Sequence, residues 1–376
     1  MALDSQTKAY PLKTATAQRS RQQQIILGLS KVWSWLFLLM LVVFFSFEGT
    51  GFFSIRNSQN ILVAIVPILL MALGQTFVII AGGIDLSVGW VMGLASVVSA
   101  LVIRDLADSG TAIALSILIG FAAGVLSAII AGLVNGVIIA KLRVPPFIVT
   151  LGVSFIARGA AWLLSDGNVV GGQPQGLRDL GNESLLYLLR GEEKHLYFFK
   201  KPDVTGTQLR MLDRILPWPV VIALVLTLIA IFVLRRTQFG RHTYALGGSR
   251  EATVRAGVPV DRHTIMLYVL AAATAGMAGC LYTARFSGGS AIAGDPRMLS
   301  SIAAVVIGGA SLFGGEGTVA GTMVGALIIA VIETGLVMMA VDPFWQYIIV
   351  GIVVITAVLI DQARDLIIGR AETAQV

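Results

Sequence analysis

Ionisable and amide side chains are rare inside the apolar part of this chain, and the few present are the first candidates for function. Asp85 lies in the stretch AGGIDLSVG, between two apolar runs that carry almost no charge. Arg158 and Glu333 lie within other apolar runs, and Gln75 and Asn135 add two amides. A charge at the centre of a bilayer is costly and usually faces protein or a water-filled cavity. We therefore regard these five residues as candidates for translocation or gating.

Four of the five candidates also have a purely structural interpretation. Arg158 and Glu333 could each be half of a buried ion pair, with each other or with another residue, instead of lining a pathway. Gln75 and Asn135 could form the hydrogen bonds that commonly join membrane helices. The sequence leaves both interpretations open for each residue.

The turn around Asp85 has two interpretations as well. Asp85 or Ser87 could cap the free N–H groups of the helix that follows, where the helix dipole favours an anion. Gly82 and Gly83 would let the chain reverse sharply before that helix. Alternatively, Asp85 could belong to a gate that changes partners during transport. Neither interpretation makes it a sugar ligand.

Catalytic and metal-binding chemistry is not indicated. The three histidines, at positions 195, 242 and 263, have none of the spacings of a zinc site, and Cys280 is the single cysteine. A phosphate-binding loop needs G-x-x-x-x-G-K-[ST], and the chain has no Gly-Lys pair. We expect no metal, no cofactor and no enzymatic activity in this chain.

Composition identifies the elements that hold these residues as membrane helices. The chain is 56% hydrophobic and 13% charged, whereas a soluble domain has about 25% charged residues. A helix needs about 17 to 25 apolar residues to cross a bilayer. We predict an all-α polytopic membrane protein with about ten spans, at 31–48, 61–80, 88–103, 111–140, 147–164, 215–234, 265–284, 299–313, 318–340 and 344–360. The third and eighth runs are short and interrupted by glycine, so we expect them to be tilted, broken or only partly crossing.

Basic residues predict the orientation, because Lys and Arg are enriched in cytoplasmic loops. With both termini inside, the cytoplasmic segments hold most of them, while the short outside loops hold only Arg56, Arg104, Arg285 and Arg297. The net charge of +6 therefore reflects topology and does not indicate nucleic acid. We expect a cytoplasmic tail (1–30), one transmembrane domain (31–360) and a second cytoplasmic tail (361–376). The domain includes an external segment (165–214) and a cytoplasmic loop (235–264).

A weak internal repeat relates the two halves of the chain. Gly120 and Gly124 precede Asn135 in the fourth run, and Gly317 and Gly321 precede Glu333 in the ninth. Each copy follows a short run preceded by an aspartate. Because five spans separate the copies, the halves would have inverted topology, a common plan in transporters. Small residues at this spacing also occur in many membrane helices simply for packing.

The longest interior loop, RRTQFGRHTYALGGSREATVRAGV (235–258), is too polar to lie in lipid. The stretch SREATVRA (249–256) predicts a short helix with Ser249 as its N-cap. Gly247 and Gly248 before it allow a tight turn. From composition alone, a solvated basic loop that only fixes topology is the simpler interpretation.

Five ordered blocks resemble one family of transport proteins. They are GGIDLSVG, NGVIIAKLRVPPFIVTLG, RTQFGRHTYALGGSREATVRAGV, VVIGGASLFGGEGTVAGTMVGA and FWQYIIVGIVVITAV. In this order they resemble the membrane permease of bacterial monosaccharide ABC importers, the ribose/xylose permease family, most closely the xylose type. The resemblance covers about residues 55–362. The family usually has Asn where Ser249 stands, and Asn-Gly in place of Glu333-Thr334-Gly335, and the second difference bears on the substrate.

The resemblance implies a multi-pass protein of the bacterial inner membrane that imports a monosaccharide, with a pentose such as xylose as the expected cargo. Its expected partners are a second permease copy, ABC ATPase subunits at the cytoplasmic face and a periplasmic sugar-binding protein, with the bilayer around it and no nucleic acid. The helix at 249–256 would be the coupling element in a groove of the ATPase. The residues implied in coupling are Gly247, Gly248, Ser249, Arg250, Glu251, Ala252 and Arg255.

Two other functions are compatible with parts of the sequence. A proton-coupled secondary sugar transporter is suggested by Glu333, Asp295 and the inverted repeat, although a proton relay would need deep acids in several spans. A membrane scaffold without transport activity would explain neither the repeat nor the five blocks.

Overall fold

The computed structural model describes residues 21–49, 51–190, 195–206, 208, 211–342, 344–353, 355–356 and 359, with side chains described from residue 33 onward. Residues 1–33 and 34–376 form two compact units. The predicted C-terminal cytoplasmic tail lies outside the described residues. Residues 1–20 of the predicted N-terminal tail lie outside them as well.

Seven helices in the described part of the chain are long and apolar enough to cross a membrane. Six of the ten predicted runs each correspond directly to one of these seven helices. The seventh helix is the short third run, whose helix continues through Arg104 and Asp105. The expectation of a short third span is therefore wrong. The seven helices are α2 (Ile55–Ile80), α3 (Val88–Asp108), α4 (Ile113–Lys141), α5 (Pro146–Leu164), α8 (Trp218–Arg236), α11 (Val260–Phe286) and α13 (Val319–Met338).

The three remaining runs form shorter helices. The first run is the apolar part, Trp33–Glu48, of α1 (Arg21–Glu48), and the tenth begins with an apolar helix over Phe344–Val353. The eighth run is α12 (Asp295–Ile307), 13 residues long. At 1.5 Å per residue it measures about 20 Å, which is less than the roughly 30 Å of a hydrocarbon core. The chain stops being helical at Gly308 and Gly309, the second with φ +87°, so α12 is too short to span the hydrocarbon core by itself.

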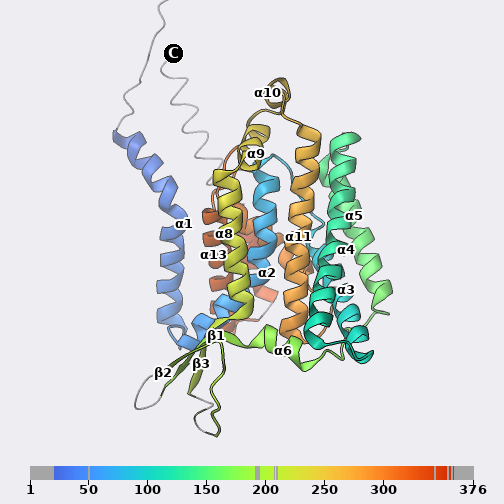
Figure 1. Ribbon diagram of the computed structural model, residues 1–376. Helices are drawn as coiled ribbons and strands as arrows, with labels where there is room; N and C mark the ends of the chain where they lie inside the picture. The colour runs from blue at the N-terminus through green and yellow to red at the C-terminus, as the bar shows by residue number, and fades with distance from the viewer. Residues whose placement is uncertain are drawn as a thin grey trace, which may run out of the picture. The chain divides into compact units, whose positions relative to one another are not determined.

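Helix α11 occupies the centre of the bundle and packs against α2, α3 and α4 (Figure 1). Glycines make these crossings unusually close. A Cβ on Gly132 of α4 would lie 2.5 Å from the Tyr268 carbonyl oxygen, and one on Gly279 would lie 2.3 Å from the Met92 carbonyl oxygen. In a membrane such close backbone contact is a main source of helix association. These crossings fix α11 relative to its neighbours.

The two halves of the bundle pack in equivalent ways. Helix α11 contacts α3 and α4, while α2 contacts α12 and α13, and α2 and α11 contact each other. Gly124 of α4 approaches the Ala95 carbonyl of α3, and Gly325 of α13 approaches the Ala304 carbonyl of α12. Helices α2 and α11 run in opposite directions (Figure 1). This arrangement agrees with inverted repeats, although Gly317, predicted in the ninth span, lies in the preceding loop with φ +146°.

The segment predicted to be external is not wholly helical. It contains α6 (Gln175–Asn182) and strands β1 (Ser184–Leu189), β2 (His195–Phe198) and β3 (Leu212–Pro217). The strands form an antiparallel sheet in the order β2-β1-β3, with Leu188 opposite Leu196 and Asp213. We call these four elements the external cap. The described chain is otherwise mostly helical, as predicted, and this small sheet belongs to the external segment.

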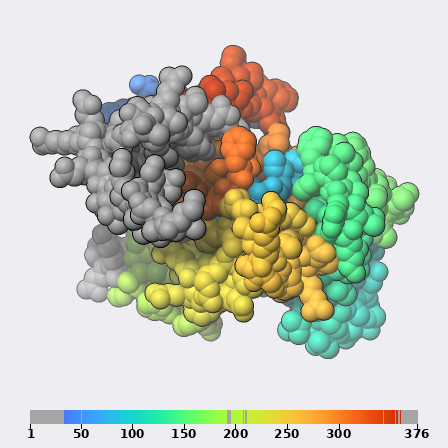
Figure 2. Space-filling view, turned by 90° about the horizontal axis from the view of Figure 1, so that it is seen from above, coloured from blue at the N-terminus to red at the C-terminus, as the bar shows by residue number. Residues whose placement is uncertain are grey.

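The external cap and the loop of residues 235–258 lie at opposite ends of the bundle (Figure 1). That loop forms α9 (Gln238–Gly248) and α10 (Arg250–Arg255). Seen from this end, both helices lie at the molecular surface (Figure 2). By the predicted orientation this is the cytoplasmic end, and the end with the cap is the external end.

Candidate functional site

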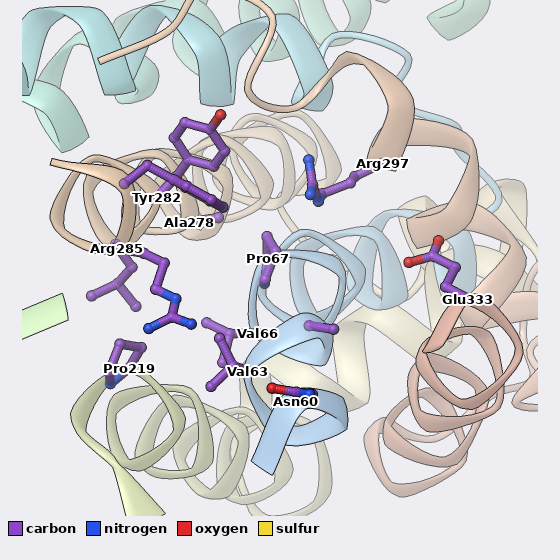
Figure 3. Close-up of a pocket in the computed structure, with 13 residues that line it drawn as sticks. Asn60, Val63, Val66, Pro67, Pro219, Ala278, Tyr282, Arg285, Arg297 and Glu333 are labelled. Atoms are coloured by element: carbon purple, nitrogen blue, oxygen red, sulfur yellow. The ribbon is translucent and has the colours of Figure 1, made fainter. Parts of the chain in front are cut away.

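A cavity of about 250 Å³ lies toward the external end, between α2, α8, α11, α12 and α13 (Figure 3). Its polar wall combines Glu333 of α13 with Arg297 of α12 and Arg285 of α11. Tyr282 and Asn60 add a phenol and an amide. The remaining wall is mainly apolar, with Val63, Ala64, Val66, Pro67, Pro219, Ala278, Leu281 and Phe286.

This wall suits a small polyhydroxylated molecule. Two guanidinium groups donate hydrogen bonds, the carboxylate accepts them, and the phenol and the amide can do both. Tyr282 and Phe286 lie against each other, with ring centroids 4.5 Å apart, and give the pocket an aromatic surface. A cavity with a largely apolar wall and a few convergent polar groups is the usual form of a small-molecule site.

The sequence alone did not reveal this cluster. Arg285 and Arg297 counted only as basic residues of outside loops, and no aromatic group was associated with Glu333. Tyr282 lies 51 positions before Glu333 in the sequence, so only the packing of both α11 and α13 against α2 brings them to one pocket. The single available signal was that Glu333 is an acid within an apolar run.

Arg158 and Glu333 do not form the ion pair considered above. The guanidinium of Arg158, on an exposed position of α5, lies 4.7 Å from the centre of the Trp90 ring. Among the described residues no ion pair involves Glu333. Arg158 is therefore held against α3 by a cation–π contact, while Glu333 lines the external pocket.

The other three candidates form one buried group around the turn between α2 and α3. They are Gln75 of α2, Asp85 of the turn and Asn135 of α4. The amide of Gln75 donates to the Asp85 carbonyl oxygen, and that of Asn135 donates to Ser87 Oγ at 2.8 Å. The side chain of Ser87 is buried, as are those of the three candidates. Hydrogen bonds thus join α2, the turn and α4, and Gly82, with φ +79°, makes the predicted reversal.

We expected Asp85 or Ser87 to cap α3, but neither side chain does so. The Oδ1 atom of Asp85 accepts from the backbone N–H of Ser87 at 2.8 Å and from the Ser87 hydroxyl at 2.6 Å. Ser87 is the N-cap residue, but its hydroxyl accepts no hydrogen bond from the first turn of α3; it donates to Asp85 and accepts from Asn135. Burial raises the pKa of the Asp85 carboxyl to about 6, against the lowering effect of the two bonds from Ser87. The carboxyl fixes the turn and faces no pocket residue.

At the cytoplasmic end, α10 forms as the sequence predicts. Ser249 is its N-cap and accepts from the Ala252 N–H at 3.2 Å. Glu251 and Arg255, one turn apart, form an ion pair at 2.6 Å. Arg250 reaches Asp261 of α11 at 3.6 Å. Apart from the buried Thr253, every residue from Ser249 to Arg255 is exposed, so α10 offers nearly its whole surface to a partner.

Gly247 and Gly248 do not form the tight turn that we expected. Both belong to the last turn of α9, and neither has a positive φ. Gly247 instead permits close packing, because an added Cβ would lie 1.8 Å from the Ile80 carbonyl oxygen and 2.4 Å from the Gly315 nitrogen. An added Cβ on Gly248 would have no heavy atom within 4 Å. The two glycines therefore have different roles.

Comparison with known proteins assigns the chain. Residues 57–358 match the family described as the branched-chain amino acid transport system / permease component. The chain belongs to this permease family. The ribose import permease of Bacillus subtilis is 34% identical over 90% of this chain and 94% of its own. The fructose import permease of Rhizobium meliloti is 36% identical over 86% and 83%. The xylose transport system permease of Haemophilus influenzae is 34% identical over 87% and 94%.

The match agrees with the predicted family and with a multi-pass protein of the inner membrane. The relatives are named for different monosaccharides at nearly equal identity, so the comparison does not favour xylose. No solved structure matches the chain. The permease family also agrees with the seven helices of membrane-spanning length described above.

Proposed function

We propose that this permease is the translocation subunit of an ATP-driven importer for a monosaccharide, a pentose such as xylose, delivered by a periplasmic binding protein. The carrying observation is α10, a capped and exposed helix joined to α11 at the end opposite the external cap. A separate ATPase subunit would hold α10 in a groove and hydrolyse ATP. The residues proposed to contact the ATPase, or to orient α10 toward it, are Gly247, Gly248, Ser249, Arg250, Glu251, Ala252 and Arg255.

The external pocket supports a small sugar as the cargo. Its volume of about 250 Å³ accommodates one monosaccharide ring. Glu333, Arg297 and Asn60 offer hydrogen bonds to hydroxyl groups, and Tyr282 offers an aromatic face. We place the sugar here after its release from the binding protein and before it moves inward. Gln75, Asp85 and Asn135 lie at the other end of the bundle, where they would govern the cytoplasmic exit.

A second permease copy would cover the outer face of α5. This face exposes Phe155 and Ile156 together with the charged Arg158, and Gly152 and Gly159 have no neighbour within 4 Å of an added Cβ. A guanidinium facing lipid inside a span is costly. A partner helix would remove that cost, and the two glycines would allow close approach.

Transport in reconstituted vesicles tests the proposal. The permease, the ATPase and the binding protein are assembled with ATP inside or outside, and uptake of a labelled pentose or hexose is measured. The proposal requires uptake that depends on the binding protein and on ATP at the face that carries α10. Uptake that needs neither and collapses with a protonophore would instead support the proton-coupled transporter. Greater uptake of a hexose would reject the pentose assignment alone.

A further inference from the structure

One side chain of the external cap, Asn182, joins the cap to the end of α11. Its Oδ1 accepts a hydrogen bond from the Arg285 guanidinium, and its Nδ2 donates to the Arg285 carbonyl oxygen at 3.1 Å. The same Nδ2 donates to the Arg178 carbonyl oxygen at 3.0 Å. Arg214 of β3 donates to the Asn182 carbonyl oxygen at 2.6 Å. Asn182 thus links α6, the sheet and α11.

The backbone around this link is packed without free space. A Cβ on Gly181 would lie 2.2 Å from the Ala284 carbonyl carbon and oxygen, so α6 rests directly on the last turn of α11. Arg178 adds a hydrogen bond from its Nε to Ser287 Oγ at 3.2 Å. Ser287 ends α11 in the left-handed conformation, with φ 54°. The cap therefore cannot tilt without moving this end of α11 or breaking these bonds.

The other end of α11 is attached to α10. The Val258 N–H donates to the Thr253 carbonyl oxygen at 3.3 Å, and Arg250 pairs with Asp261 in the first turn of α11. Between the two ends, α11 is one uninterrupted helix of 27 residues. Its close glycine crossings with α3 and α4 disfavour bending, because compact interiors transmit a displacement rather than absorb it. A rigid-body movement of α11 together with α3 and α4 would therefore carry both ends of α11.

We propose that Asn182 and Arg285 are a positioning pair that couples the external cap to α10 through α11. This inference rests on the proposed function: docking of the binding protein at the external end displaces the cap, α11 follows, and α10 passes the movement to the ATPase. Arg285 also lines the external pocket, so the same guanidinium registers both the docked protein and the arriving sugar. Neither residue contacts the ATPase or its nucleotide.

ATP hydrolysis by the purified permease–ATPase complex in lipid discs tests the pair. Hydrolysis is measured without and with the sugar-loaded binding protein, and the ratio of the two rates is the readout. Asn182→Ala and Arg285→Gln should each lower that ratio at least about fivefold, the lower end of usual coupling between sites. The rate without binding protein should stay unchanged in Asn182→Ala, because Asn182 does not line the external pocket. The double variant should be no worse than either single variant, because both remove the same link.

Two further variants keep the test decisive. Asn182→Asp retains the acceptor for Arg285 and should preserve most of the ratio. Arg190→Gln removes an ion pair with Asp213 inside the sheet, without contact to α11, and should leave the ratio unchanged. An unchanged ratio in Asn182→Ala, or an equal loss of both rates, would overturn the inference, as would a loss in Arg190→Gln as large as in Asn182→Ala. If the wild-type complex is not stimulated at all, the proposed function itself fails.

Discussion

Two neighbouring glycines show how far the role of a residue depends on what surrounds it. Gly247 and Gly248 are indistinguishable in sequence, yet only at Gly247 would an added Cβ meet backbone atoms of α2 and of the loop before α13. A side chain at Gly247 would have to separate α9 from Ile80 and Gly315. That contact holds α9 in place together with the hydrogen bond from the Tyr244 hydroxyl to the Gly317 carbonyl oxygen.

We predict that Gly247→Val weakens the cytoplasmic end of the bundle, while Gly248→Ala is tolerated. Overpacking of this kind costs about 1–3 kcal/mol, so the thermal midpoint of the detergent-solubilised permease should fall for Gly247→Val, and copurification of the ATPase should fall with it. Gly248→Ala is the control for the thermal midpoint alone, because its Cβ meets no atom of this chain within 4 Å. Equal behaviour of the two variants would contradict the close contact.

Glu333→Gln tests the external pocket at a single carboxylate. The substitution keeps the shape of the side chain and removes its charge. Because Glu333 lines the pocket and is not paired with Arg158, assembly and thermal stability should be unchanged. A hydrogen bond to a charged group contributes about 1.5–3 kcal/mol, so uptake at low sugar concentration should fall at least about tenfold.

The control for this substitution is Glu48→Gln, an exposed acid at the end of α1 that does not line the pocket. It should transport normally. If Glu333→Gln instead destabilises the protein with little change in specific transport, the carboxylate has a structural partner, and the pocket loses its central polar group.

At the scale of an element, α10 depends on its cap more than on its length. It has only six helical residues, too few to be stable alone, because isolated helices below about 12–15 residues are marginal in water. Its first turn is held by Ser249 and its last by the Glu251–Arg255 pair, while Arg250 attaches it to α11. Since that surface pair is exposed and contributes little, Ser249 is the main local support.

Ser249→Ala should therefore loosen α10 by about 0.5–2 kcal/mol, the usual cost of losing an N-cap. We expect weaker binding of the ATPase with normal membrane insertion, measured as the dissociation constant of the detergent-solubilised complex. Ser249→Asn, which retains a capping oxygen, should bind as the wild type does. Equal weakening by Asn and Ala would mean that the hydroxyl contacts the partner directly and that capping is not its role.

At the scale of the whole molecule, the external cap and α10 lie at opposite ends of a bundle crossed by α11 (Figure 1). Both proposals require the membrane to separate them. The excess of basic residues in the predicted cytoplasmic loops is the reason for placing α10 inside. The buried position of Cys280, the only native cysteine, makes the arrangement easy to measure.

Cysteines introduced singly at Arg190 and Ala252, both exposed, should react with a membrane-impermeant thiol reagent from opposite faces. Position 190 should label in intact cells, and position 252 only after the membrane is opened or inverted. The unmodified chain should label from neither side, because Cys280 is fully buried. Labelling of both positions from one face would invalidate the topology and the proposed path from cap to α10.

The sequence by itself determined the local properties of this protein. Apolar runs identified the membrane helices, Ser249 marked the start of α10, and ordered motifs indicated the permease family. These features depend on residues close together in the chain. Only the tertiary structure decided that Glu333 joins Arg285 and Arg297, that Arg158 lies on Trp90, and that Gly247 is a packing residue. Such contacts depend on which helices approach through their glycines, and a helix of apolar residues is compatible with many neighbours until that packing is set.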